Sequence, residues 1–129
     1  MVLRNYEADN QAATNCPNAT ETVVCQLDGV NQGAPGNPIG IKGWFNGLTG
    51  VGATTITLRI RRGTTVAGTV IGQAAPTPAT ASVNVDAIVA GTDISAAELG
   101  NQSYVLTATV AGGAVAMTAA GAHLSATVA

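Results

Sequence analysis

The stretch that decides the fold is "TTITLRIRRGTTVAGTVIG", residues 54–72. In its first half, Ile56, Leu58 and Ile60 alternate with polar residues, which is the two-residue period of a β-strand. The "RGTT" that follows is typical of a turn, and residues 66–72 again favour a strand. The stretch therefore predicts a β-hairpin. It also contains three of the five basic residues of the chain: Arg59, Arg61 and Arg62.

The composition indicates one small domain with an aliphatic core. The chain has 129 residues, of which 47% are hydrophobic, 9% charged and only 3% aromatic. A chain of this length fits one domain, and its Val, Ile, Leu and Ala suit a thin β-sandwich better than a deep pocket. Apolar runs stop well short of the roughly 18 residues that span a bilayer, which excludes a membrane helix. A net charge of −2 gives no overall attraction for nucleic acid.

The N-terminal residues differ from the remainder. Residues 1–19 show no apolar period, so we expect an extended arm that precedes a β-sandwich domain over residues 20–129. The segment also lacks the basic start and apolar run of a secretory signal. We therefore expect the chain to be made in a cytoplasm.

Turn residues divide the domain into eight predicted strands, the spacing of an all-β sandwich. Residues 91–100 favour a helical turn or a long connection, and the last three strands are expected to form a C-terminal meander. The predicted strands cover residues 20–27, 39–46, 54–62, 66–72, 81–87, 102–110, 114–119 and 122–128.

Residues 99–129 contain no Asp, Glu, Lys or Arg. An exposed strand surface normally carries some charge, partly to prevent edge-to-edge aggregation. We therefore expect a second subunit to cover these strands. The alternative is that Thr, Ser and Gln supply enough polarity for a monomer.

No catalytic or metal-binding motif is present. The single histidine, His123, has the outward period of its strand and no nucleophile or acid beside it in the sequence. The carboxylates are scattered, and Cys16 and Cys25 form either a small disulfide loop or two free thiols. Trp44 is expected in the core. The sequence thus predicts a non-enzymatic protein without a cofactor or metal.

The arginines of the hairpin have three interpretations. Arg59 and Arg61 lie side by side on the polar face, with Arg62 at the turn, and guanidinium groups recognise carboxylates bidentately. They are solvated charges, or they pair with Asp86 or Glu98 of a neighbouring subunit, or they dock an acidic external partner.

The hairpin "TLRIRRGTTVAGTVIG", the strand "YVLTATVAGG" and the Ala/Thr-rich ending resemble the small trimeric jelly-roll proteins, with a tumour-necrosis-factor-like (TNF-like) fold, that decorate tailed-bacteriophage capsids. The resemblance covers residues 20–129 and implies a homotrimer on the outer capsid surface that bridges major capsid proteins. It also implies that the arm, with Arg4 and Tyr6, latches onto the shell. The candidate capsid or subunit contacts are Arg4, Tyr6, Arg59, Arg61 and Arg62.

The sequence therefore predicts a structural virion protein that stabilises a phage capsid from outside. The alternative is a carbohydrate- or receptor-binding module at the tip of a fibre or appendage. Such a module would use loop residues such as Trp44, Asp28 and Asn31.

Overall fold

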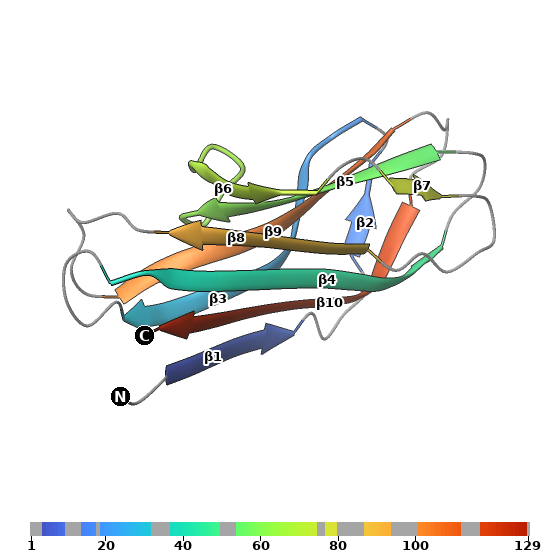
Figure 1. Cartoon of the computed structure of the whole chain (residues 1–129). Helices are drawn as coiled ribbons and strands as arrows, with labels where there is room; N and C mark the ends of the chain where they lie inside the picture. The colour runs from blue at the N-terminus through green and yellow to red at the C-terminus, as the bar shows by residue number, and fades with distance from the viewer. Residues whose placement is uncertain are drawn as a thin grey trace.

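The computed structural model is an all-β sandwich (Figure 1) and describes residues 4–9, 14–17, 19–31, 37–49, 54–74, 77–79, 87–93, 101–111 and 117–128. Ten strands lie within these residues. They are β1 (Arg4–Asp9), β2 (Thr14–Cys16), β3 (Thr22–Asn31), β4 (Ile39–Thr49), β5 (Thr54–Arg62), β6 (Val70–Gln73), β7 (Thr77–Ala79), β8 (Ala87–Asp93), β9 (Asn101–Ala111) and β10 (Met117–Val128).

The strands form two antiparallel sheets. Sheet A has the order β1-β10-β4-β8, and β2 also pairs with β10. Sheet B has the order β3-β9-β5-β6, and β7 also pairs with β5. From β8 to β10 each strand crosses to the other sheet, as strands do in jelly rolls. The predicted all-β sandwich is confirmed, with eight strands of four residues or more and the three-residue β2 and β7.

The core lies between the sheets and follows the alternation of the sequence. Ile56, Leu58 and Ile60 of β5 are buried as predicted. Ile60 lies opposite Leu106 of the adjacent β9, and all of these residues belong to one core cluster with Leu124 of sheet A. Aliphatic side chains dominate the described core, consistent with the low aromatic content. The hairpin is also confirmed, although β6 begins only at residue 70 because residues 63–69 form the turn.

The C-terminal prediction was wrong in its topology. Residues 117–128 form one strand instead of two, because Gly121 pairs with Asn46 and continues the β10–β4 ladder. The expected meander is absent because β9 belongs to sheet B and β10 to sheet A. In the predicted connection 91–100, residues 91–93 end strand β8. The rest of that segment, and residues 81–86 of a predicted strand, lie outside the described residues.

Within the predicted N-terminal arm, the described residues 4–9 and 14–16 form strands β1 and β2 of sheet A. Strand β1 pairs with β10 from Arg4, opposite Val128, to Asp9, opposite His123. Tyr6 packs against the core, and the Cys25 thiol of β3 donates to the carbonyl oxygen of Ala8 over 3.3 Å. β1 therefore forms one edge of sheet A and closes the sandwich against β3.

The opposite side closes where β6 of sheet B lies beside β8 of sheet A (Figure 1). A Cβ at Gly91 would lie 2.4 Å from the carbonyl oxygen of Ile71, and one at Gly72 would lie 2.5 Å from that of Ala90. Real Cβ atoms do not approach backbone so closely, so the strands meet only because both positions are glycine.

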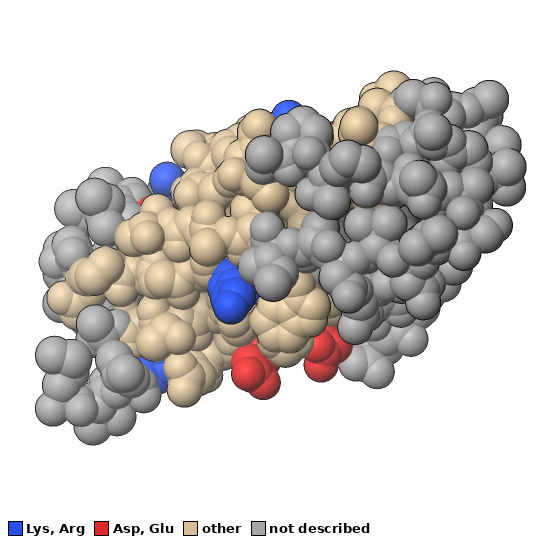
Figure 2. All heavy atoms as spheres, turned by 45° about the vertical axis from the view of Figure 1, so that its right-hand side comes forward, with Lys and Arg blue, Asp and Glu red and all other residues tan. Residues whose placement is uncertain are grey.

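The strands without charged residues occupy central positions. β10 lies between β1 and β4, and β9 lies between β3 and β5. Val105 and Thr107, on the outward side of β9, are fully buried within a single chain. In Figure 2, the charged residues that the structure describes appear as separate spots among the uncharged ones. The described parts of β9 and β10 therefore need no charged residues to prevent edge-to-edge pairing, because central strands present no free edge. No helix in the described part of the chain is long and apolar enough to cross a membrane.

Candidate interaction surface

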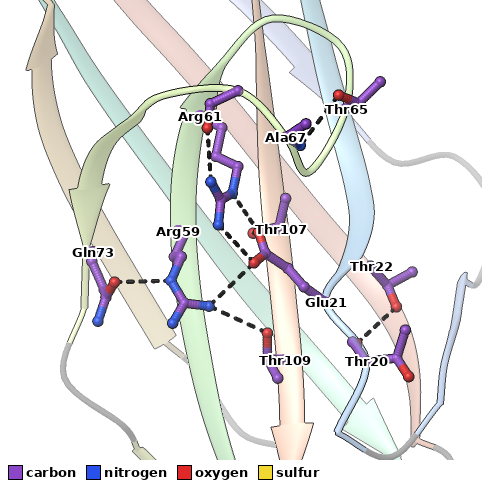
Figure 3. Close-up of polar contacts among 11 residues, drawn as sticks. Thr20, Glu21, Thr22, Arg59, Arg61, Thr65, Ala67, Gln73, Thr107 and Thr109 are labelled. Carbon is purple, nitrogen blue, oxygen red and sulfur yellow. Dashed lines mark hydrogen bonds and ion pairs between the residues drawn. The ribbon is translucent and has the colours of Figure 1, made fainter.

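Two of the predicted arginines meet on the outer face of sheet B, the side of this sheet that points away from the core. Arg59 and Arg61 are two residues apart in β5, so both side chains project to this face. Figure 3 shows both guanidinium groups directed at the carboxylate of Glu21, which immediately precedes β3. One carboxylate therefore serves two cations.

Arg61 uses all of its guanidinium nitrogens within the chain. Its Nε donates to Oε2 of Glu21 over 2.6 Å, and its Nη2 donates to Oε1 over 2.8 Å, a bidentate ion pair. Its Nη1 donates to the carbonyl oxygen of Gly68 over 2.7 Å. The Arg61 hydrogen bond holds the pKa of Glu21 below its usual value against the opposing effect of burial, and Glu21 raises the pKa of Arg61 in turn. The hydroxyl of Thr107 also donates to Glu21, over 2.7 Å.

Arg59 is bound more loosely. Its Nε donates to Gln73 over 2.8 Å, while its Nη1 reaches Glu21 and Thr109 only at 3.4 Å each. The side chain is 25% exposed, compared with 16% for Arg61. Gln73 and Thr109 thus orient Arg59, but its positive charge is only weakly neutralised because Arg61 already binds the Glu21 carboxylate.

Arg62 joins the two sheets. Its Nε donates to Oδ2 of Asp93 over 3.0 Å, and the hydroxyl of Tyr104 donates to the same oxygen over 2.8 Å. Tyr104 and Asp93 are both buried. Because Asp93 lies in β8 of sheet A and the other two residues lie in sheet B, this cluster ties one end of the sandwich together.

The carboxylates that pair with the arginines are not those proposed from sequence. Asp86 and Glu98 lie outside the described residues. Glu21 is 38 and 40 positions from its two arginines, so no local pattern indicates the pairing. No sequence pattern indicates that Asp93 contacts Arg62 either. Both contacts depend on which strands become neighbours, which the alternation of a single strand does not encode.

The hairpin turn beside these arginines is well ordered by hydrogen bonds. The amide of Arg62 donates to Thr69, and the amide of Gly63 donates to Ser103 on β9. A pocket of about 320 Å³ lies between the turn and β9. Val66 is 41% exposed and Val70 is 40% exposed, and these are the large apolar side chains that remain exposed in the described part of the chain.

The remaining predicted contacts lie elsewhere. Arg4 is exposed on β1 of sheet A, and Tyr6 of the same strand packs on the core. The structure therefore brings together Arg59 and Arg61, but not Arg4 and Tyr6, at the outer face of sheet B.

The residues of the alternative glycan site are also separated. Trp44 is half-buried on the outer face of sheet A, where its ring stacks on His123 with centroids 4.0 Å apart, so its predicted core position was wrong. His123 also hydrogen-bonds to Asp9 across the β1–β10 ladder, which favours its outward placement. Asp28 and Asn31 belong to β3 of sheet B.

The cysteines and acidic groups show no metal site within the described residues. Cys16 and Cys25 are both buried and are not joined in a disulfide. Burial raises the pKa of the Cys25 thiol to about 11, which makes it a poor metal ligand or nucleophile. No group of three or more His, Cys, Asp or Glu side chains gathers in the described ranges.

No protein-family profile and no curated protein sequence matches the chain. Among solved structures, it is similar to a chain of the structure of infectious bursal disease virus, Gx strain, with a TM-score of 0.64 and 12% sequence identity. The match covers 98% of this chain and 32% of that one, so this chain spans about a third of its neighbour's length. At this identity the likeness establishes the shared β-sandwich fold.

Proposed function

We propose that this chain is a structural protein of a virus particle, located on the outside of the capsid, where it stabilises the shell by bridging major capsid proteins. The observation that carries the proposal is the likeness, over 98% of the chain, to part of a protein from a virus structure. The more specific role, on the outside of the capsid and bridging major capsid proteins, is proposed from the resemblance of the sequence to TNF-like decoration proteins.

The ionisable groups of the described residues support a structural role. Arg61 and Glu21 join β5 to the start of β3, Arg62 and Asp93 join the two sheets, and His123 joins β10 to β1 through Asp9. Each pair connects segments that are distant in sequence. Such ties stiffen a sandwich, and a rigid body suits a protein that must hold neighbouring subunits in place.

The number of copies in the assembly is a separate part of the proposal. The family resemblance implies a homotrimer, which would present three copies of each weak contact and so raise the affinity for a shell by roughly a hundredfold or more. The uncharged strands, from which we expected a second subunit, are central in their sheets, as described above. The trimer therefore rests on the family resemblance alone.

The test is to locate the chain on particles. Particles from cells that produce the chain are purified on a density gradient and labelled with an antibody against it. We expect the chain to sediment with intact particles and the antibody to bind them without disruption. Particles without the chain should release their genome at a lower temperature. A chain that stays at the top of the gradient would overturn the proposal.

A further inference from the structure

The outer face of sheet B carries an unbalanced positive charge on its β5 side. Arg61 and Glu21 form a bidentate pair at 2.6 and 2.8 Å, whereas the ion pair between Arg59 and Glu21 is a single contact at 3.4 Å. Two guanidinium groups share one carboxylate, which leaves one positive charge. The Nη2 group of Arg59 makes no hydrogen bond to any residue that the structure describes, and the side chain is accessible.

The same face carries a fixed negative charge on its β3 side. Asp28 is exposed, and its Oδ1 accepts hydrogen bonds from Nε2 of Gln26 over 2.9 Å and from the hydroxyl of Ser103 over 2.8 Å. These bonds lower the pKa of Asp28, so the carboxylate is ionised and oriented. Gln26 lies opposite Val105, which lies opposite Arg61, so Asp28 and the arginines project from the same side of the sheet.

One strand separates the two charges. β9 lies between β3 and β5, so Asp28 and Arg59 are two strand spacings apart across the sheet, about 10 Å. Asp28 also lies beside Ser103 and Arg59 opposite Thr107, which separates them by about 13 Å along β9. The side chains of β9 between them are Val105 and the threonines 107 and 109, all uncharged. The charges are therefore too far apart to neutralise each other within one copy.

The basic side of the face also carries exposed apolar surface. Val70 lies opposite Arg61 in the β5–β6 ladder and is 40% exposed, and Val66 in the adjacent turn is 41% exposed. Exposed apolar side chains beside arginine are typical of the centres of protein interfaces. The hydrogen bonds of the turn hold these valines in place, which lowers the entropy lost on binding.

We infer that the outer face of sheet B is a self-complementary surface at which two copies of this chain pair around a two-fold axis, with Arg59 of each copy bound to Asp28 of the other. A two-fold axis in the plane of the contact, passing over Val105 and perpendicular to the line from Asp28 to Arg59, places Asp28 of one copy opposite Arg59 of the other. Each pair of copies then gains two charge contacts from one patch, as in the isologous interfaces of most homodimers. With only 9% of residues charged and a net charge of −2, repulsion between the copies is weak.

This pairing predicts units of two chains, where the family resemblance predicts three. It does not depend on the proposed function, because association of the purified chain involves no particle. Self-association without particle binding would therefore contradict the proposed function but not this inference. Particle binding by a monomer would contradict this inference but not the proposed function.

The test is the mass of the purified full chain by sedimentation equilibrium, from roughly 1 µM to 1 mM. We expect a monomer–dimer equilibrium, weakened at least tenfold by Arg59→Gln and by Asp28→Asn. The matched control is Lys42→Gln, which removes an exposed cation from the outer face of sheet A and should leave the equilibrium unchanged. Melting temperatures confirm that each variant is folded.

The decisive measurement mixes the two interface variants. A homodimer of either variant lacks both contacts, but a mixed dimer keeps one, between Arg59 of the Asp28→Asn chain and Asp28 of the Arg59→Gln chain. We therefore expect the mixed dimer to be tighter than either variant dimer. A wild-type monomer, a three-chain mass, an equal effect of Lys42→Gln, or a mixture that gains nothing would each overturn the inference.

Discussion

Replacing Glu21 with Gln removes the carboxylate that the two outer arginines share. Exposed ion pairs contribute about 0.2–1 kcal/mol, whereas removing one partner of a buried pair costs about 3–5 kcal/mol. The Glu21 side chain is 17% exposed and that of Arg61 is 16% exposed, so the site lies between these limits. We expect Glu21→Gln to lower the free energy of unfolding by about 2 kcal/mol at pH 7. For a chain of this length this corresponds to a fall of roughly 7 °C in melting temperature.

The effect should depend on pH in a defined direction. Arg61 holds the folded-state pKa of Glu21 below the ordinary value of 4.5, so folding favours the ionised form. The stabilisation is complete above the unfolded pKa and disappears as the pH falls through the lower, folded pKa. The difference in stability between wild type and Glu21→Gln should therefore be constant near neutrality and shrink below about pH 4.5.

Urea denaturation monitored by circular dichroism, at several pH values, measures both effects. Glu7→Gln is the matched control, because Glu7 is exposed on β1 and makes no ion pair with any described residue. It should change stability by less than about 0.5 kcal/mol. The reasoning is refuted if the two variants have the same stability at pH 7, or if the cost of Glu21→Gln is unchanged at pH 3.

Three further predictions concern the fold. Gly91→Ala should lower the free energy of unfolding by about 2 kcal/mol or more in denaturant titration, because the new Cβ would clash with the carbonyl oxygen of Ile71. Gly40→Ala is the control and should cost less than about 1 kcal/mol, because a Cβ at Gly40 would have no atom within 4 Å. Ala19 has a φ of 58°, so Ala19→Gly should raise the unfolding free energy by about 0.5 kcal/mol, and a loss of stability would contradict the strain argument. Burial raises the pKa of Cys25 to about 11, so iodoacetamide at pH 8 should alkylate it roughly 100-fold more slowly in the folded chain than in urea, and equal rates would show that the thiol is accessible.

The arginines show how far sequence reasoning extends at the candidate surface. Alternation correctly placed Arg59 and Arg61 on the polar face of one strand, because side-chain direction in a strand follows from local geometry. It did not identify Glu21 or Asp93 as their partners, since those contacts form only when distant strands become neighbours. It likewise placed Trp44 in the core, although the residue faces outward, because the register of a weakly alternating segment is set by its neighbours.

By itself, the sequence determined the all-β class, the aliphatic core, the β5–β6 hairpin and the outward direction of Arg59 and Arg61. These features depend on composition and on a two-residue period, which act over a few neighbouring positions. Only the tertiary structure decided that β9 and β10 lie in different sheets, that β1 completes sheet A, and that Arg59 and Asp28 share one face. Strand order has these consequences because each strand in a sheet takes its hydrogen-bond partners from segments far away in the chain, and many orders satisfy the same alternation.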